Sequence, residues 1–349
     1  MGIVDEHPEW SSRLIAELTS RRLPWEKIDH SNHGYDPRDR QPRYSVIVNR
    51  SSPSSHRRGH GNVLFYTEAL LRHYESIGIP VINPVAAYRF EKSKALQIDL
   101  FERLGLRYPR AVVLNHCDQL LKAADALRFP VVVKPNVGGS GAGIVRLDSR
   151  AELEARASSL DFGPDGTALL QEYVEAREGA IVRVEVLDGA CLYAIRIVRT
   201  TDDFNLCPAD ICQVPAAAPA LAACPVDVTP GMSVSRYDAP PEAIEGALAL
   251  ARVASIDVGG VEYLVGRDDG RIYFYDVNAT SNFVANAPEV LGFDPFGPFV
   301  DSIVAVATRG RRRAAARRVR TARAGRGGPR RGGAALAAAG PAQRRGPSA

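Results

Sequence analysis

Apolar and polar positions alternate along the first part of the chain in a pattern that predicts short helices and strands. Apolar residues recur at helical spacing over residues 11–22, with Ser11 or Ser12 as N-cap, and over residues 62–77. In the second helix one apolar face is expected to hold Leu64, Phe65, Leu70, Leu71 and Tyr74. β-rich runs surround the helices at Trp25–Ile28, Tyr44–Val48 and Pro80–Ile82. Strands separated by a helix in this order predict a small α/β domain over residues 1–88.

Helical and strand-like segments continue to alternate after residue 88. A helix is expected over Phe90–Leu104, stopped by Gly105, and another from about Asp118 to Leu127. Strands are predicted at Val112–Leu114, Val131–Lys134, Ile181–Val184 and Ala194–Ile197. Mixed helices and strands over this length favour an α/β or α+β architecture.

Composition and charge separate a globular region from a tail. The chain of 349 residues is 45% hydrophobic and 24% charged, as in a protein of two or three domains. Its net charge of +4 hides an asymmetry: residues 309–349 hold thirteen arginines and no acid, whereas residues 1–308 hold 31 basic and 40 acidic residues, a net charge of −9. We expect the tail, 309–349, to be disordered. It is a candidate nucleic-acid arm, but its lack of aromatic residues favours a solvated extension.

The sequence predicts neither a membrane segment nor an export signal. No apolar run approaches the ~20 residues that span a bilayer, and the N-terminus carries Asp5, Glu6 and Glu9 with no apolar stretch. The five cysteines are scattered, which fits a reducing cytoplasm, and we expect a cytoplasmic protein. Cys207 and Cys212 lack further residues at metal-ligand spacing, so a structural or pocket-lining role is expected for them.

The most informative segment lies near the end of the globular region. Two β-rich runs flank the turn Arg267–Gly270 and predict a β-hairpin. A turn centred on Asp269 places Glu262 opposite Asp276, and alternation along the strand puts Asn278 on the same face as Asp276. Two carboxylates and an amide oxygen are natural ligands for a hard cation, Mg²⁺ first, with Mn²⁺ possible and Ca²⁺ not excluded.

A second constellation predicts phosphate binding. Lys134 ends a buried strand, and residues 138–143, which follow it closely, contain four glycines and a serine. Such a backbone can approach a polyphosphate closely and direct several N–H groups toward it. The lysine precedes the glycines and a strand-like run, Ile144–Leu147, follows them, unlike the order in a P-loop or a dinucleotide-binding fingerprint. We therefore interpret residues 138–143 as a hairpin flap over phosphates.

The segment Leu169–Glu175 allows two interpretations. Taken alone, it predicts an ordinary buried strand. Because it follows the lysine and the flap, we favour a linker whose backbone hydrogen-bonds the edge of an adenine.

The order of these motifs resembles that of the ATP-grasp superfamily. The strand-end lysine, the flap, the Gln-Glu-Tyr-Val segment and the Glu…Asp-x-Asn hairpin are similar to those of RimK-like carboxylate–amine ligases, of the ribosomal protein S6 glutamate ligase type. The resemblance covers roughly residues 45–306 and implies an α/β (α+β) ATP-grasp fold. It places a pre-ATP-grasp domain at 1–88 and an ATP-grasp domain at 89–308, in which a lid at about 112–174 and a C-terminal subdomain at about 175–308 sandwich ATP.

The resemblance also implies roles for individual residues. Lys94, preferred over the nearby Lys92, and Lys134 would contact ATP phosphates. Glu178 would contact the ribose, because Ile181 occupies the place where many relatives carry an acid. The other implied contacts are Gly139, Ser140 and Gly141 over the phosphates, Gln171, Glu172, Tyr173 and Val174 at the adenine, and Glu262, Asp276 and Asn278 at a Mg²⁺ ion that bridges the phosphates.

Two arginines occupy alternating strand positions, where an inward arginine is costly unless an anion pairs with it. The resemblance implies a catalytic role for Arg196 and Arg183, against an acyl-phosphate and its transition state. The alternative for Arg183 is a structural ion pair with Glu185 or Glu262. Asn205 lies where such ligases often have an amide near the γ-phosphate.

Two departures from the family pattern bear on the substrates. The first metal carboxylate is Glu262, where aspartate is commoner. Relatives usually show Ser-Pro-Gly after the Asp-x-Asn, whereas this chain has Thr280-Ser281-Asn282-Phe283. Because that loop helps to form the acceptor side of the site, the amine substrate is expected to differ from the best-known ones.

The motifs together predict an enzyme. We expect an ATP-dependent ligase that joins a small-molecule carboxylate to an amine, such as an amino acid, peptide or natural-product precursor, through an acyl-phosphate, with release of ADP and phosphate. The resemblance suggests a homodimer or homotetramer. The alternatives are a kinase of the same fold that phosphorylates a hydroxyl, a nucleic-acid-binding protein that uses the basic tail and, as the weaker hypothesis, a degenerate ATP-binding regulator.

Overall fold

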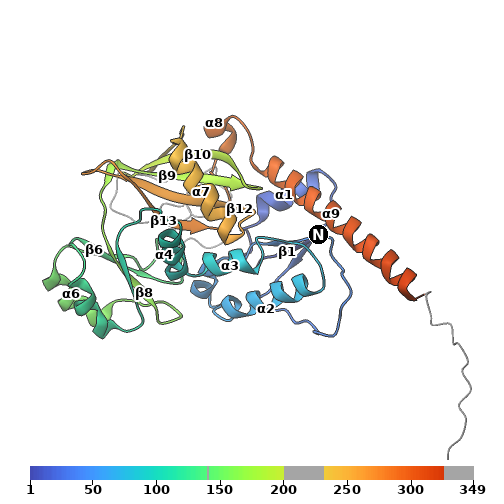
Figure 1. The fold of residues 1–349 in the computed structure, drawn as a ribbon, viewed down its shortest axis with the longest axis horizontal. Helices are drawn as coiled ribbons and strands as arrows, with labels where there is room; N and C mark the ends of the chain where they lie inside the picture. Colours follow the sequence, from blue (N-terminus) through green and yellow to red (C-terminus); the bar gives the residue numbers. More distant parts are fainter. Residues whose placement is uncertain (140, 200–231, 326–349) are drawn as a thin grey trace, which may run out of the picture. The chain divides into compact units, whose positions relative to one another are not determined.

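Three sheets contain the strands of the part of the chain that the computed structural model describes, residues 1–139, 141–199 and 232–325. The first is a parallel sheet of the N-terminal domain with the strand order β2-β1-β3-β4. Its strands are β1 (Gly2–Val4), β2 (Glu26–Ile28), β3 (Ile47–Asn49) and β4 (Val81–Ile82). The helices of this α/β unit are α1 (Ser12–Ser20) and α2 (Val63–Ser76), with a short 3-10 helix at Pro53–Arg58 (Figure 1).

The two predicted helices of this domain are present, with differences in detail. Ser11 occupies the N-cap position of α1 but does not cap it, because its hydroxyl donates instead to Asp5 Oδ2 at 2.6 Å. In α2, four of the five apolar side chains expected on the buried face are buried, whereas Phe65 is 69% exposed. The prediction for Phe65 is wrong because it lies at the edge of the helix's apolar stripe.

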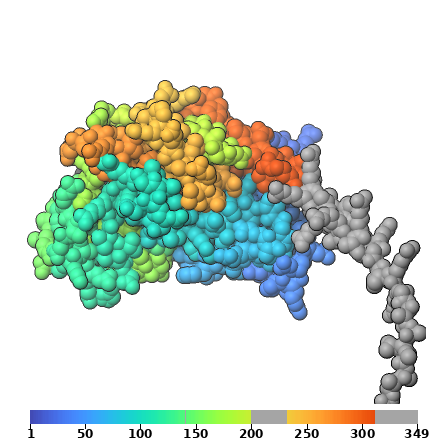
Figure 2. Space-filling view, in the orientation of Figure 1, coloured from blue at the N-terminus to red at the C-terminus, as the bar shows by residue number. Residues whose placement is uncertain are grey.

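The second sheet belongs to the segment predicted to be the lid. Its strands pair antiparallel in the order β5-β8-β6-β7, with β5 (Ala111–Leu114), β6 (Val131–Pro135), β7 (Val145–Leu147) and β8 (Ala168–Glu172). Helices α5 (Leu120–Ala124) and α6 (Arg150–Arg156) pack on it through a small core around Leu120, Val131, Leu153 and Leu170. The space-filling view shows this subdomain, in teal and green, beside the blue N-terminal domain (Figure 2).

The third and largest sheet is antiparallel, with the order β11-β10-β9-β12-β13. Its strands are β9 (Ala176–Leu187), β10 (Ala190–Arg199), β11 (Met232–Arg236), β12 (Val258–Gly266) and β13 (Ile272–Asn278). Helix α7 (Pro241–Ala254) covers one face, where Ala247 and Leu250 pack with Val182, Val184 and Tyr263 (Figure 1). Its other face carries Ile195, Ile197 and Leu264, which belong to a separate core.

The helix predicted over Phe90–Leu104 is two helices. The chain forms α3 (Val85–Glu91) and then α4 (Lys94–Arg103), separated at Lys92 and Ser93. The Ser93 side chain accepts from the backbone N–H of Leu96 and so caps a new helix. This break puts Lys94 at the first residue of α4.

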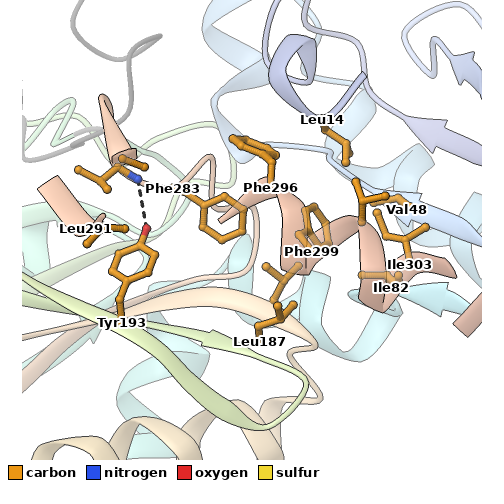
Figure 3. Packing of buried hydrophobic residues seen from close by; sticks show 14 of the residues in the cluster. Leu14, Val48, Ile82, Leu187, Tyr193, Phe283, Leu291, Phe296, Phe299 and Ile303 are labelled. Carbon is orange, nitrogen blue, oxygen red and sulfur yellow. Dashed lines mark hydrogen bonds between the residues drawn. The ribbon is translucent and has the colours of Figure 1, made fainter. Parts of the chain in front are cut away.

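The core on the second face of the large sheet joins this sheet to the N-terminal domain. Leu187 and Tyr193 of the sheet, Leu14 and Val48 of the N-terminal domain, and Phe299 of helix α9 share one cluster (Figure 3). Phe283 packs edge-to-face against Phe296 and Phe299, with ring centroids 5.0 and 5.9 Å apart. The short helix α8 (Ala287–Leu291) contributes Leu291 to this cluster. The loop after β13 is therefore anchored in a core that both domains build.

The segment expected to be disordered from residue 309 begins as a helix instead. Helix α9 runs from Phe296 to Gly325. Residues 309–325 are mostly alanine and arginine, which have high helix propensity and continue an already formed apolar helix. Among the described residues, no helix is long and apolar enough to cross a bilayer.

Candidate active site

The predicted hairpin is formed by β12 and β13, and its strands pair in the predicted register. Glu262 lies opposite Asp276, and Gly260 lies opposite Asn278. A β-bulge next to Glu262 makes Tyr275 the extra residue on β13. Glu262, Asp276 and Asn278 all line one pocket, so two carboxylates and an amide meet as the sequence predicts.

Each carboxylate of the hairpin has a cation beside it. Lys94 Nζ donates to Asp276 Oδ1 at 2.6 Å, and Arg183 Nη1 donates to Glu262 Oε1 at 2.8 Å. Burial raises the pKa of Glu262, and the Arg183 guanidinium offsets only part of that rise. Burial alone would lower the pKa of Lys94, but the Asp276 carboxylate outweighs it and raises the pKa overall. The hairpin thus carries a compact cluster of two anions and two cations.

The position of Lys94 depends on a link between α4 and the end of β6. Asn136, just after β6, accepts from the Ser93 hydroxyl at 3.1 Å and from the backbone N–H of Ala95 at 2.8 Å. The Lys94 N–H donates to the backbone oxygen of Asn136 at 3.2 Å. Lys92, the other candidate, instead pairs with Glu68 at 2.9 Å and does not line the pocket. The structure therefore brings Lys94 into the site.

Lys134 is buried in β6 and has a neutral partner. Its side chain is directed into the pocket, where Nζ donates to Gln171 Oε1 at 2.9 Å. The ammonium also lies 5.6 Å from the centre of the Tyr275 ring. Burial, and next the charge of Lys94, lower the pKa of Lys134 to about 8. Among the described residues no carboxylate pairs directly with this ammonium, which leaves it suited to an anionic ligand.

The glycine-rich segment connects β6 to β7 and covers the pocket, as predicted for a hairpin flap. Gly138, Gly139 and Gly141 line the pocket, while Ser140 lies outside the described residues. Gly143 has a positive φ of 76°, and a Cβ there would lie 2.9 Å from Pro135 Cγ. The turn therefore requires glycine at that position to fold back over the strand.

The segment predicted as an adenine linker follows a buried strand, so both interpretations of Leu169–Glu175 describe part of it. Strand β8 ends at Glu172, and Glu172, Tyr173 and Val174 line the pocket. Glu172 Oε1 accepts from the backbone N–H of Arg128 at 3.0 Å, and the N–H of Tyr173 donates to the Pro130 oxygen at 2.8 Å. These bonds hold the linker against the lid.

Arg183 forms the ion pairs that the structural alternative predicts. Its Nε donates to Glu185 Oε1 at 2.6 Å, while Nη1 reaches Glu262, and all three side chains are buried. The two carboxylates outweigh burial and raise the pKa of Arg183. A Cβ on Gly260 would lie 2.2 Å from the guanidinium carbon, so the arginine packs directly over this glycine. Arg183 also lines the pocket, and its ion pairing does not remove it from the site.

Arg196 does not join the pocket. It pairs across the sheet with Val182, which lies on the face that α7 covers, whereas Arg183 lies on the opposite face. Its guanidinium donates to Glu178, and neither residue is part of the pocket lining. The structure therefore places the predicted catalytic arginine and the predicted ribose contact away from the other candidates. The reason is strand alternation, since consecutive side chains point to opposite faces. Asn205 lies outside the described residues.

Several lining residues were missed by the sequence analysis. Glu91 at the end of α3 is half-buried, and desolvation raises the pKa of its carboxyl, which accepts from the Thr280 hydroxyl at 2.7 Å and from the backbone N–H of Ala279. In sequence it looks like a solvated charge at a helix end. Trp10 and Ser52 of the N-terminal domain also line the pocket, and no local motif marks them.

The chemistry of this pocket fits a nucleotide with a hard divalent cation. Glu262, Asp276 and Asn278 offer oxygen ligands, and the cations that now sit beside the carboxylates show that this site requires positive charge. Lys134 offers the complementary feature, a buried ammonium with only a neutral hydrogen-bond partner among the described side chains. Residues of the flap, the linker and the large sheet line this one pocket.

Comparisons with known proteins agree with this picture. Residues 94–207 match the model of the family described as D-ala D-ala ligase C-terminus. The chain is similar to a "Probable alpha-L-glutamate ligase" of Marinomonas sp., 28% identical over 168 residues that cover 47% of this chain and 52% of that protein. The matched segment therefore spans about half the length of that curated relative.

Two solved structures share the fold. One is the ATP-grasp ligase PsnB complexed with a phosphomimetic variant of its minimal precursor, Mg and ADP, with a TM-score of 0.62 at 18% identity over 88% of this chain and 98% of that one. The other is the D-alanine–D-alanine ligase of Bacillus anthracis, with a TM-score of 0.61 at 18% identity over 90% of this chain and 98% of that one. The chain has the ATP-grasp fold, and the predicted resemblance to the ATP-grasp superfamily and its RimK-like ligases is confirmed.

Proposed function

We propose that this ATP-grasp chain is an ATP-dependent carboxylate–amine ligase that forms an amide or peptide bond through an acyl-phosphate and releases ADP and phosphate. The observation that carries the proposal is one pocket that combines the buried Lys134 and Glu262 with the half-buried Lys94, Asp276 and Asn278 beneath a glycine-rich flap. Phosphoryl transfer requires mainly positioning and charge neutralisation, which this set of residues offers. Similarity to proteins described as ligases supports the same reaction class.

Each part of the pocket has a role in binding ATP under this proposal. Lys94 and Lys134 neutralise the phosphate charge, and the first turn of α4 adds the positive end of a helix next to Lys94. The flap at residues 138–143 covers the phosphates and excludes water, which would otherwise hydrolyse the activated intermediate. The linker, Glu172–Val174, borders the adenine.

Glu262, Asp276 and Asn278 would hold Mg²⁺ or Mn²⁺. When bound, the cation would offset the negative charge that develops on the transferred phosphoryl group. Lys94 and Arg183, which now sit against these carboxylates, would remain beside them and fix their orientation.

The reaction consists of two substitutions. A carboxylate oxygen of the first substrate attacks the γ-phosphorus of ATP, and the bond from that phosphorus to the β-γ bridging oxygen breaks, so that ADP leaves. The nitrogen of a neutral amine then attacks the acyl carbon of the acyl-phosphate, the bond from carbon to the phosphate oxygen breaks, and the nitrogen loses its proton. Arg183, the only arginine among the described pocket-lining residues, is placed to stabilise the anionic intermediate.

The substrates belong to the class of amino acids, peptides or related small molecules. The relatives are named for L-glutamate and D-alanine, and PsnB is described with a peptide precursor. The loop after β13 differs from the family pattern, so the acceptor of this chain need not be one of these.

A coupled assay tests the proposal. The full chain is incubated with ATP, Mg²⁺ and pairs drawn from a panel of amino acids and dipeptides, and ADP release is followed together with product mass. We expect ADP release that requires both a carboxylate and an amine, and a product lighter by one water than the two substrates combined. A product heavier by one phosphate would instead indicate the kinase alternative.

A further inference from the structure

Arg50 is a fully buried arginine that contacts the loop after β13. It follows β3 in the N-terminal domain and is 1% exposed. Its Nη1 donates to the backbone oxygen of Ser281 at 2.7 Å, and its Nη2 donates to Asn282 Oδ1. A buried guanidinium needs such acceptors, because it can neither lose its proton nor reach water. Arg50 therefore fixes the position of the loop through two hydrogen bonds from the N-terminal domain.

This contact fixes the orientation of the Asn282 amide. A guanidinium has donors only, so the amide oxygen must face Arg50 and the amide nitrogen must point elsewhere. Asn282 lines the pocket, and none of the described residues accepts a hydrogen bond from its Nδ2. Asn282 thus carries two N–H donors that have no acceptor among the described residues.

A second residue of the lining also carries a donor that lacks a partner. The indole Nε1 of Trp10 is buried and has no hydrogen-bond partner among the described residues, although Trp10 lines the pocket. A buried indole N–H normally finds an acceptor. The neighbouring hydroxyls of Ser52 and Ser54 bond to each other at 2.9 Å. Two residues from distant parts of the sequence therefore line this pocket, and each carries a donor that has no acceptor among the described residues.

The loop that carries Asn282 is fixed by further contacts. The Ser281 hydroxyl donates to Glu185 Oε1 at 2.8 Å, and the Thr280 hydroxyl donates to Glu91. The N–H of Val284 donates to the Tyr193 hydroxyl at 3.1 Å, as drawn in Figure 3. A loop held on both sides of Asn282 presents its amide in one orientation, which is the condition for selective binding.

We propose that Asn282 and Trp10 are specificity-determining residues that donate hydrogen bonds to a carbonyl or carboxylate oxygen of a substrate, on a group other than the one that reacts. The inference rests on the proposed ligase function and assigns a chemical feature to its substrate, an oxygen acceptor such as the free carboxylate of an amino acid or the carbonyl of a peptide.

The substitution N282D tests the donor role at constant shape. The aspartate retains an oxygen for Arg50 but replaces the N–H₂ with an oxygen, which repels a substrate acceptor. W10F removes the other donor and keeps an aromatic ring. N115D adds the same charge at an exposed residue outside the pocket and is the matched control.

Binding and turnover are both measured. Binding tests the role of Asn282 and Trp10, and turnover tests the ligase reaction, so that each proposal can fail without the other. The probes are L-glutamate, L-alanine and L-alanyl-L-alanine, each as free acid, carboxamide and methyl ester, with binding followed by calorimetry on the full chain. We expect N282D to weaken binding of the preferred probe by about tenfold or more, and W10F to weaken it by a smaller factor. Both variants should bind ADP as the wild type does, and N115D should bind the preferred probe as the wild type does. If the free acid binds more tightly than its carboxamide, the acceptor on the substrate is a carboxylate. If the two bind equally, the acceptor is a carbonyl oxygen.

Two results would overturn the inference: wild-type chain that binds none of these probes, or N282D and W10F that bind them as wild type does. Binding that depends on Asn282 without any amide product would support the inference while contradicting the ligase proposal. If turnover occurs, a raised KM for the amino acid with an unchanged KM for ATP separates substrate recognition from a structural role of Asn282.

Discussion

The two ends of the pocket are built in different ways. At the hairpin end, charged residues from α4, β9, β12 and β13 pair with one another, as in Lys94 with Asp276. At the other end, the N-terminal domain and the loop after β13 present neutral donors, from Trp10 and Asn282, that have no described partner. Under the proposed function, the charged residues would hold a nucleotide and a metal ion, and the neutral donors would bind a polar group of the substrate.

The two lysines of the pocket show the same contrast on a smaller scale. Lys94 has a carboxylate partner, so its pKa rises, whereas Lys134 has a neutral partner and its pKa falls to about 8. Lys94 is neutralised by Asp276, whereas Lys134 has no charged partner among the described residues.

The largest effect is expected at the hairpin. D276N removes one ligand charge and leaves Lys94 without its partner, so ADP release should fall by about a hundredfold or more. The matched control is D268N, an exposed position in the turn of the same hairpin. Steady-state ADP release, with circular dichroism as a check on folding, measures the effect. Turnover within threefold of wild type would show that Asp276 is not part of the reacting site.

The next largest effect concerns stability. Glu185 Oε1 accepts from both Arg183 and Ser281. E185Q removes one of the negative charges that neutralise the buried Arg183 guanidinium, so it should lower the free energy of unfolding by about 3 kcal/mol. E175Q breaks the exposed pair of Glu175 with Arg267 and should cost under about 1 kcal/mol. Urea unfolding compares the two variants. Equal costs would contradict the view that the buried contacts of Glu185 stabilise the fold more than the exposed pair does.

A pH dependence of nucleotide binding follows from Lys134. Its pKa lies near 8 in the free protein, so the ammonium is charged below that pH and loses its proton as the pH rises through about 8. We expect ADP affinity to be flat below pH 8 and to fall about tenfold above it, because one charge-assisted contact is lost. K134R, which stays charged, should abolish the dependence. Calorimetry at several pH values provides the data, and a wild-type profile that is flat to pH 10 would refute the assignment.

The smallest effect is expected at Arg196. It lies on the face of the sheet covered by α7 and pairs with Glu178, so R196A should change kcat/KM by no more than about a factor of two. The same assay on R183A should show a large loss. A large loss in R196A as well would mean that the arginine reaches the reacting atoms in a state that differs from this structure.

The sequence predicts the hairpin end well because its signals are local. The register of Glu262 with Asp276 follows from turn position and strand alternation, and Lys134 with its flap is one continuous segment. Which side of the sheet an arginine faces depends on the phase of the side-chain alternation in its strand, and the sequence does not specify that phase. Arg183 lines the pocket, whereas Arg196 lies on the opposite face of the sheet, and the catalytic roles of both arginines stay predictions.

The other end escapes sequence analysis because its residues are far apart in the chain. Trp10, Arg50 and Asn282 meet only through the packing of the N-terminal domain on the large sheet. A half-buried carboxylate such as Glu91 looks like a surface charge until its partners, Ala279 and Thr280, are brought to it by folding. The tail shows a further limit, since an Arg- and Ala-rich composition predicts disorder although its first part extends helix α9.

The most direct test of the central claim follows the oxygen that joins carboxylate and phosphate. A carboxylate substrate found in the ADP-release screen is labelled with ¹⁸O in its carboxyl group, and the phosphate released with the amide product is analysed by mass spectrometry. Because the carboxyl oxygen that attacks ATP leaves with the phosphate, the account predicts one ¹⁸O atom in each phosphate formed. Phosphate without label, accompanied by turnover, would contradict an acyl-phosphate and with it the proposed ligase reaction.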